Sequence, residues 1–167
     1  VMAKSARATG RRSGTGVEGT TRVVGIFGDP VDHSLSPRMH NAAFRALGLD
    51  YVYVPFRPAS RTIGAAVESI RALGLAGVNV TVPFKRDVMP HLDRVSDTAR
   101  AAGAVNTIVN RDGKLFGENT DVPGFAAALL AAGFRVRGKR AIVIGAGGAA
   151  RGVVHALLTS GAAEVVV

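Results

Sequence analysis

The chain has 167 residues, of which 47% are hydrophobic and 20% charged, with a mean hydropathy of +0.24 and no cysteine. This composition predicts a folded domain with its own core, and it excludes disulfide frameworks, thiolate metal sites and cysteine nucleophiles. The formal net charge is +9, of which residues 1–22 contribute +4, so the rest is only mildly basic and suits a phosphorylated small molecule as well as a nucleic acid.

Residues 1–21 are expected to form a disordered basic leader. They lack the apolar stretch of a secretory signal, and no part of the chain approaches the ~20 apolar residues of a membrane span. We therefore expect neither export nor membrane insertion, and a cytoplasmic location. The Arg-rich and Ser-rich composition also matches a transit peptide, so a transit peptide, a bacterial leader and an expression remnant stay open.

From residue 23 onward, short apolar runs alternate with segments of helical periodicity, which predicts an α/β fold with a mainly parallel sheet. Strands are expected at 23–28, 51–56 and 77–82. The helices between them are expected to start at the N-cap residues Ser36 and Ser60 and to end at Gly48 and Gly74. One or two charged helices follow, up to residue 100.

The second half of the chain is expected to contain one antiparallel hairpin and then a new βα unit. Apolar runs at 104–109 and 114–118 flank Asp112-Gly113, a pair typical of tight hairpin turns. The elements expected after the hairpin are a helix at 123–132, a basic connector at 134–140, a buried strand at 141–146, a glycine turn leading into a helix, and a strand at 162–167.

The glycine turn comprises Gly145, Ala146, Gly147, Gly148 and Ala149, where a strand turns into a helix. Gly145 permits a tight turn, Gly147 lets the backbone approach a pyrophosphate, and the helix N-terminus stabilises negative charge. The pattern therefore predicts a dinucleotide site. The alternative is a glycine turn that only packs the helix against the strand.

Polar residues follow several of the predicted strands. Ser34 and Ser36 could hold a carboxylate, although loop hydrogen bonding explains such a pair more simply. Lys85 lies just beyond a buried strand, where open α/β sheets place their ligands, although solvated lysines are far commoner. Thr120 or Asp121 is expected to cap the next helix.

Five segments occur together in one order: HSLSPRMHNAAF (33–44), GVNVTVPFK (77–85), the run 97–107 ending in GAVNT, GENTDVPGF (117–125) and IGAGGAAR (144–151). With these segments, the chain from residue 23 resembles the shikimate dehydrogenase family. The resemblance implies a substrate domain (22–121), a linking helix and connector (122–138) and the start of an NADP-binding Rossmann domain (139–167). It also implies reversible NADP-dependent reduction of 3-dehydroshikimate to shikimate, a step of chorismate and aromatic amino acid biosynthesis.

The resemblance implies a role for each polar candidate. Ser34 and Ser36 match the hydroxyls that hold the substrate carboxylate. Lys85 matches the catalytic lysine, which exchanges, together with Asp121, the proton at the oxygen that becomes ketone or alcohol. The residues that match contacts to the ring hydroxyls are Thr81, Asn106 and Asp121. The diphosphate-binding turn matches Gly145, Ala146, Gly147, Gly148 and Ala149, and no metal is implied.

Several alternatives remain open. The sequence reaches residue 167, where a dinucleotide fold is not yet complete, so we expect this chain alone to be inactive. The sequence leaves two points undecided: the choice between NADP and NAD, and the oligomeric state. The enzymatic alternative is an NAD-preferring quinate or shikimate paralogue, against which Ser36 argues, since quinate-using relatives tend to have threonine there. The others are a noncatalytic protein that binds shikimate-like acids, and salt-sensitive nucleic-acid binding through the leader. We expect small-molecule partners, and neither nucleic acid nor a membrane.

Overall fold

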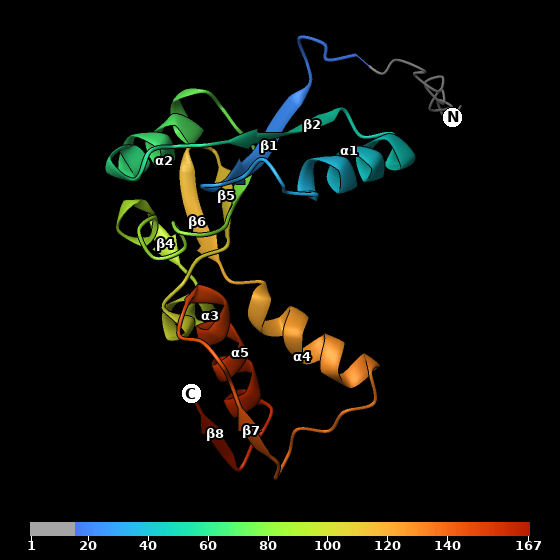
Figure 1. Ribbon diagram of the computed structural model, residues 1–167. Helices are drawn as coiled ribbons and strands as arrows, with labels where there is room; N and C mark the ends of the chain where they lie inside the picture. Colours follow the sequence, from blue (N-terminus) through green and yellow to red (C-terminus); the bar gives the residue numbers. More distant parts are fainter. Residues whose placement is uncertain (1–15) are drawn as a thin grey trace, which may run out of the picture.

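The computed structural model describes residues 16–167, which form an α/β structure with two separate sheets, so the expected fold class is confirmed (Figure 1). Residues 1–15, most of the expected leader, lie outside the described residues. In chain order the elements are β1 (Arg22–Phe27), α1 (Ser36–Leu47), β2 (Tyr51–Phe56), η1 (Ser60–Thr62), α2 (Ile63–Ala72), β3 (Gly77–Val80), η2 (Met89–His91), β4 (Arg94–Val95), α3 (Asp97–Ala102), β5 (Thr107–Arg111), β6 (Lys114–Glu118), α4 (Asp121–Ala131), β7 (Arg140–Ile142), α5 (Gly148–Thr159) and β8 (Glu164–Val166).

The larger sheet has six strands in the order β2-β1-β3-β5-β6-β4. β1 is parallel to β2 and β3, and β4 is parallel to β6, whereas β5 is antiparallel to both of its neighbours. The predicted hairpin is therefore formed by β5 and β6. It turns at Asp112 and Gly113, whose φ angles of 53° and 82° fit a type I′ turn. β7 and β8 pair in parallel in a second sheet of two strands. The prediction of a buried strand at 141–146 is wrong: β7 is shorter, and Ile142 and Ile144 are 78% and 97% exposed, because β8 is the one strand that pairs with β7 among the described residues.

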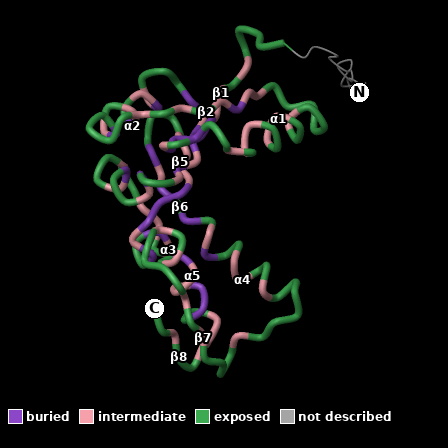
Figure 2. Tube along the Cα trace, in the orientation of Figure 1, coloured by how far each residue is buried: buried purple, intermediate pink, exposed green. Residues whose placement is uncertain are grey.

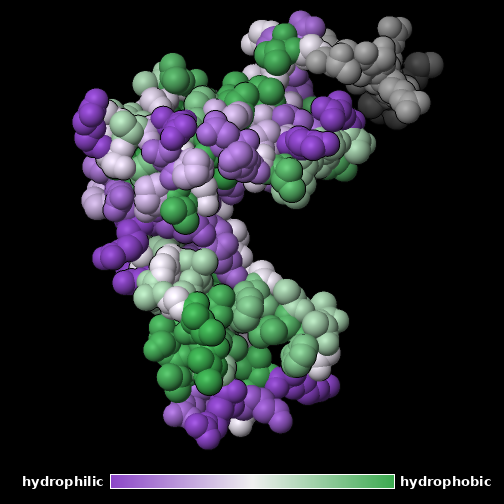
Figure 3. Space-filling model, viewed as in Figure 1, coloured by the Kyte–Doolittle hydropathy of each residue, from purple (hydrophilic) through white to green (hydrophobic). Residues whose placement is uncertain are grey.

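The larger sheet and α1 lie at one end of the molecule, and α4, α5 and the small sheet lie at the other (Figure 1). Exposed residues dominate α1 and α4, whereas buried residues follow the strands of the larger sheet and continue into α5 (Figure 2). Between α1 and α4, the face of the molecule shown in Figure 3 is hollowed.

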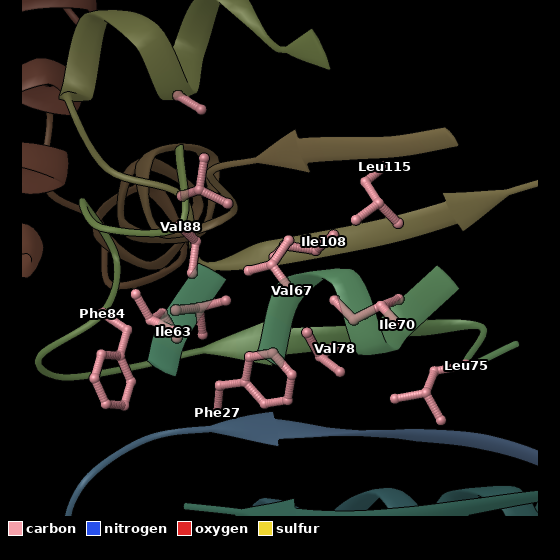
Figure 4. Packing of buried hydrophobic residues seen from close by; sticks show 13 residues of the cluster. Phe27, Ile63, Val67, Ile70, Leu75, Val78, Phe84, Val88, Ile108 and Leu115 are labelled. Atoms are coloured by element: carbon pink, nitrogen blue, oxygen red, sulfur yellow. The ribbon is translucent and has the colours of Figure 1, made fainter. Parts of the chain in front are cut away.

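The main core lies between the larger sheet and α2. The helical spacing of α2 aligns Ile63, Val67 and Ile70 on one buried face, which packs against side chains from the strands (Figure 4). Val67 and Ile70 are completely buried, and burial of one such side chain contributes about 1.5–3 kcal/mol. The side chains that they meet include Phe27 from β1 and Ile108 from β5. This packing holds together the strands whose ends carry the polar residues.

The helix starts differ from those predicted from the sequence. α1 begins at Ser36 itself, its N-cap position is Leu35, and Ser36 forms no capping side-chain bond to any described residue. The N–H of Ser36 instead donates to Ser34 Oγ at 3.3 Å, so the capping prediction for Ser36 is wrong. Ser60 opens a short 3-10 helix instead of capping α2, which begins only at Ile63.

The ends of α1 and α2 agree with the prediction, because Gly48 and Gly74 have φ angles of 66° and 62°. Residues 83–96 contain turns, η2 and β4, so α3 is shorter than the charged helix or helices expected there. The last leader residues are not disordered, since Thr20 and Thr21 donate to the Asp50 carboxylate at 2.7 and 2.6 Å. Among residues 16–167, none of the helices combines the length and the apolar composition that crossing a membrane requires.

Candidate active site

The residues predicted to contact substrate lie at one edge of the larger sheet. Ser34 and Ser36 follow β1, and Lys85 lies in the turn after β3, which is parallel to β1. Asn106 directly precedes β5 and Asp121 follows β6; because β5 is antiparallel to β3 and to β6, both residues return to that same edge. The topology therefore gathers side chains that are far apart in the sequence, at the place where such sheets bind ligands.

Lys85 and Asp121 form an ion pair where the sheet meets α4. The distance from Lys85 Nζ to Asp121 Oδ2 is 2.6 Å, and the two side chains are 15% and 34% exposed. The ammonium and the carboxylate are thus partly shielded from water and still accessible to a ligand.

Asn106 holds the second oxygen of this carboxylate. Its Nδ2 donates to Asp121 Oδ1 at 2.8 Å and to Thr120 Oγ1 at 2.9 Å. Its Oδ1 accepts the N–H of Thr120 at 2.9 Å, and the residue is 8% exposed. Both amide hydrogens are therefore used within the protein, so in this arrangement Asn106 orients Asp121.

Asn119 sets the start of α4 and with it the position of Asp121. Its Oδ1 accepts the N–H groups of Asp121 and Val122 at 3.0 and 3.2 Å, and its Nδ2 donates to the carbonyl of Ala104 at 2.9 Å. Thr120 occupies the N-cap position but forms no capping side-chain bond to a described residue. The predicted cap position at Thr120 is therefore confirmed, whereas a capping bond from the side chain of Thr120 is absent among the described residues. The residue before Thr120, which is 3% exposed, supplies the acceptor.

A line of hydrogen bonds crosses the sheet from β2 to Asn106. Tyr53 OH donates to Asn79 Oδ1 at 2.7 Å, Asn79 Nδ2 donates to Thr107 Oγ1 at 3.2 Å, and Thr107 Oγ1 donates to Asn106 Oδ1 at 3.1 Å. Burial raises the pKa of Tyr53 to about 12, and a hydrogen bond with the Ser36 side chain opposes this shift. The phenol therefore stays protonated at neutral pH and can act as a donor.

Four residues of this arrangement were missed by the sequence analysis: Tyr53, Asn79, Thr107 and Asn119. Asn79 did carry a signal, because an amide within an otherwise apolar strand needs a hydrogen-bond partner. Asn119 carried one too, because asparagine is a favoured cap and its bonds to the N–H groups of Asp121 and Val122 span only two and three residues. Tyr53 and Thr107 carry no such signal, since their bonds to Asn79 span 26 and 28 residues.

Thr81 stands at the carboxyl end of β3. Its N–H donates to the carbonyl of Phe27 at 2.9 Å, and its methyl carbon lies only 2.5 Å from the position of a Cβ built on Gly28. Thr81 is thus held tightly against the end of β1. Among the described residues, its hydroxyl has no part in the hydrogen bonds around Asp121.

The glycine turn has an open backbone at the start of α5. Gly145 has a φ of 126°, and a methyl group built on Gly147 would meet no described atom within 4 Å. The first turn of α5 contains no acidic residue, and no described side chain caps it. Exposed N–H groups at such a helix start suit an anionic group such as a diphosphate.

α5 packs against the ion pair through two glycines. A methyl group built on Gly148 would lie 3.2 Å from Lys85 Cδ, and one built on Gly152 would lie 3.3 Å from Asp121 Cβ. Because these glycines are four residues apart, they occupy one face of the helix. The structure thus brings the predicted cofactor turn next to the predicted catalytic pair. Within residues 16–167, no three His, Asp or Glu side chains are placed to hold a metal ion.

Comparison with known proteins gives a consistent result. Residues 26–108 match the family model of the shikimate dehydrogenase substrate binding domain. A curated shikimate dehydrogenase (NADP(+)) of Desulforamulus reducens is 56% identical over 146 residues, which cover 87% of this chain and 50% of that protein. The chain spans about half the length of the curated relatives that it matches.

Solved structures of shikimate dehydrogenases also match the fold. The enzyme from Aquifex aeolicus matches with a TM-score of 0.86 at 43% identity, covering 89% of this chain and 56% of that one. The Thermus thermophilus enzyme in complex with NADP(H) and shikimate matches with a TM-score of 0.80 at 40% identity, covering 87% and 55%.

Proposed function

Because the chain belongs to the shikimate dehydrogenase family, we propose that it binds shikimate and serves its reversible NADP-dependent oxidation to 3-dehydroshikimate in the cytoplasm. The observation that carries the proposal is the ion pair of 2.6 Å between Lys85 and Asp121, at the sheet edge that also holds Ser34 and Ser36. In this proposal, residues 22–121 form the substrate domain, 122–138 the linking helix and connector, and 139–167 the start of the cofactor domain.

The start of α5 fits the diphosphate of a dinucleotide, because its N–H groups are open and the backbone at Gly147 is unobstructed. When bound, the nicotinamide supplies or accepts the hydride. The other tasks fall to side chains of the chain itself. Ser34 and Ser36 hold the substrate carboxylate, and Thr81 contacts a ring hydroxyl.

Lys85 is the proton donor in the direction of reduction. As the substrate oxygen gains negative charge, the ammonium stabilises it and transfers a proton from Nζ, and in the direction of oxidation Nζ receives that proton. Asp121 holds Nζ through Oδ2, while Asn106 holds Oδ1 and so keeps the carboxylate turned towards the lysine. Gly148 lets α5, and with it the cofactor turn, lie directly against Lys85.

The catalytic role is tested by Lys85→Met, with Lys114→Met as control, because Lys114 is an exposed lysine beside the hairpin turn. Turnover of shikimate with NADP or NAD is followed as absorbance of the reduced cofactor, in this chain and in any longer form of the protein. Lys85→Met is expected to lower kcat by about 10² to 10⁴ with little change in KM, and Lys114→Met is expected to change neither. A Lys85→Met variant with normal kcat would remove Lys85 from catalysis, and faster turnover with NAD would contradict the cofactor assignment.

Substrate binding is tested separately by calorimetric titration of this chain with shikimate and with an analogue that lacks the carboxylate. Ser34→Ala removes a hydrogen bond to a charged group, worth about 1.5–3 kcal/mol, so shikimate should bind about 10- to 150-fold more weakly. The analogue should be unaffected. Absence of shikimate binding contradicts the proposal, while binding without turnover in every form identifies a noncatalytic binding protein.

A further inference from the structure

The hydrogen bonds that cross the sheet all point in one direction. The donors follow one another from Tyr53 OH to Asn79, from Asn79 Nδ2 to Thr107, from Thr107 Oγ1 to Asn106, and from Asn106 Nδ2 to Asp121. Every donated hydrogen therefore points towards the carboxylate, the one negative charge in the line. In such a chain each bond polarises and strengthens the next.

Tyr53 is the firmly held beginning of this line. The side chain of Asn41 accepts the backbone N–H of Tyr53 at 2.8 Å and donates to the backbone carbonyl of Tyr53 at 2.9 Å. Both backbone groups of Tyr53, which lies in the outermost strand β2, are therefore bonded. The ring of His40 stacks on the phenol ring at 4.4 Å with an interplanar angle of 9°. His40 and Asn41 both belong to α1, the helix that Ser36 begins, and Tyr53 is 3% exposed.

We propose that Tyr53 is a positioning residue of the site, whose hydroxyl fixes the amide of Asn79 and, through Thr107 and Asn106, the orientation of the Asp121 carboxylate. The link to substrate rests on the proposed function. The hydrogen bonds do not depend on it.

The physical reason is the two-fold ambiguity of an amide. Among the described residues, the Tyr53 phenol is the group that donates to Asn79 Oδ1. This bond fixes Oδ1 on the side of Tyr53, and Nδ2 then faces Thr107. Without this donor, the amide can turn over and present Oδ1 to Thr107. The Thr107 hydroxyl would then donate to Asn79 instead of Asn106, and Asn106 Oδ1 would lose one of its donors.

Tyr53→Phe tests the inference, because it keeps the ring and removes only the hydroxyl. Tyr51→Phe is the matched control in the same strand, since Tyr51 OH accepts from Arg22 at 2.7 Å, outside the line to Asp121. Two measurements are made on the whole chain: the side-chain amide NMR resonances of Asn79 and Asn106 without ligand, and the Kd for shikimate. The unfolding midpoint is recorded beside them.

Tyr53→Phe is expected to shift the amide resonances of both asparagines and to weaken shikimate binding about three- to tenfold, the value of one neutral hydrogen bond. Tyr51→Phe is expected to change neither. Unchanged Asn106 resonances would overturn the inference even if affinity falls, because the Tyr53 hydroxyl also bonds to the Ser36 side chain and loss of that bond lowers affinity by itself. If the amide resonances respond while the unaltered chain fails to bind shikimate, the positioning line stands and the proposed function fails.

Discussion

Asn119→Ala is expected to destabilise the chain by about 2–4 kcal/mol. Loss of Oδ1 leaves the N–H groups of Asp121 and Val122 at the start of α4 without their acceptor, a capping loss of about 1 kcal/mol. Loss of Nδ2 removes the donor to the carbonyl of the fully buried Ala104, at a cost of about 1–3 kcal/mol. The sum is a large fraction of the roughly 5–15 kcal/mol that stabilises a typical domain.

The measurement is urea unfolding followed by circular dichroism, which compares midpoint and slope between variants. Thr120→Ala is the informative control, because Thr120 is the residue that sequence patterns predict as the cap, yet it is exposed and caps nothing among the described residues. It should cost about 1 kcal/mol, because it removes no cap and only the hydroxyl that accepts from Asn106 Nδ2. Asn119→Ser retains a capping oxygen and should recover about 1 kcal/mol of the loss. A cost for Thr120→Ala equal to or above that for Asn119→Ala would refute the assignment of the cap.

Burial raises the pKa of Tyr53 to about 12, so its phenol should titrate near that pH. The measurement is tyrosinate absorbance in a Tyr51→Phe chain, in which Tyr53 is the remaining one of the two tyrosines. Because the folded state favours the neutral phenol, the contribution of Tyr53 to folding stability is complete below about pH 10 and is lost as the pH rises through 12. A titration midpoint of Tyr53 near pH 10 would contradict its burial. Gly77→Ala should lower stability by about 1–3 kcal/mol, since the added Cβ would lie 2.4 Å from the Ile108 carbonyl oxygen and would overpack the sheet. Gly124→Ala, in α4 with no described atom within 4 Å of the new methyl group, should raise stability by about 0.5–1 kcal/mol, and equal shifts in the two unfolding midpoints would contradict this contrast.

The sequence by itself determined the features that depend on local backbone preferences. Alternating apolar runs and helical periodicity indicated the α/β class, which the two sheets confirm. Asp112-Gly113 predicted the hairpin, and Gly48 and Gly74 predicted the ends of α1 and α2, because these residues adopt the positive φ angles that such positions require. The candidate site residues came from ordered motifs, and their roles in binding and catalysis remain predictions.

Only the tertiary structure decided which polar groups bond to one another. Ser34 and not Ser36 makes the local bond at the start of α1, and Asn119 and not Thr120 caps α4, because a cap depends on which oxygen reaches the free N–H groups. The line that starts at Tyr53 depends on strand order, since β2, β3 and β5 contribute to it although they are far apart in the chain. A hydrogen bond requires proximity and direction in space. Within a turn these are set by the path of the local backbone, and between strands they are set by strand order and register, which no short segment of sequence contains.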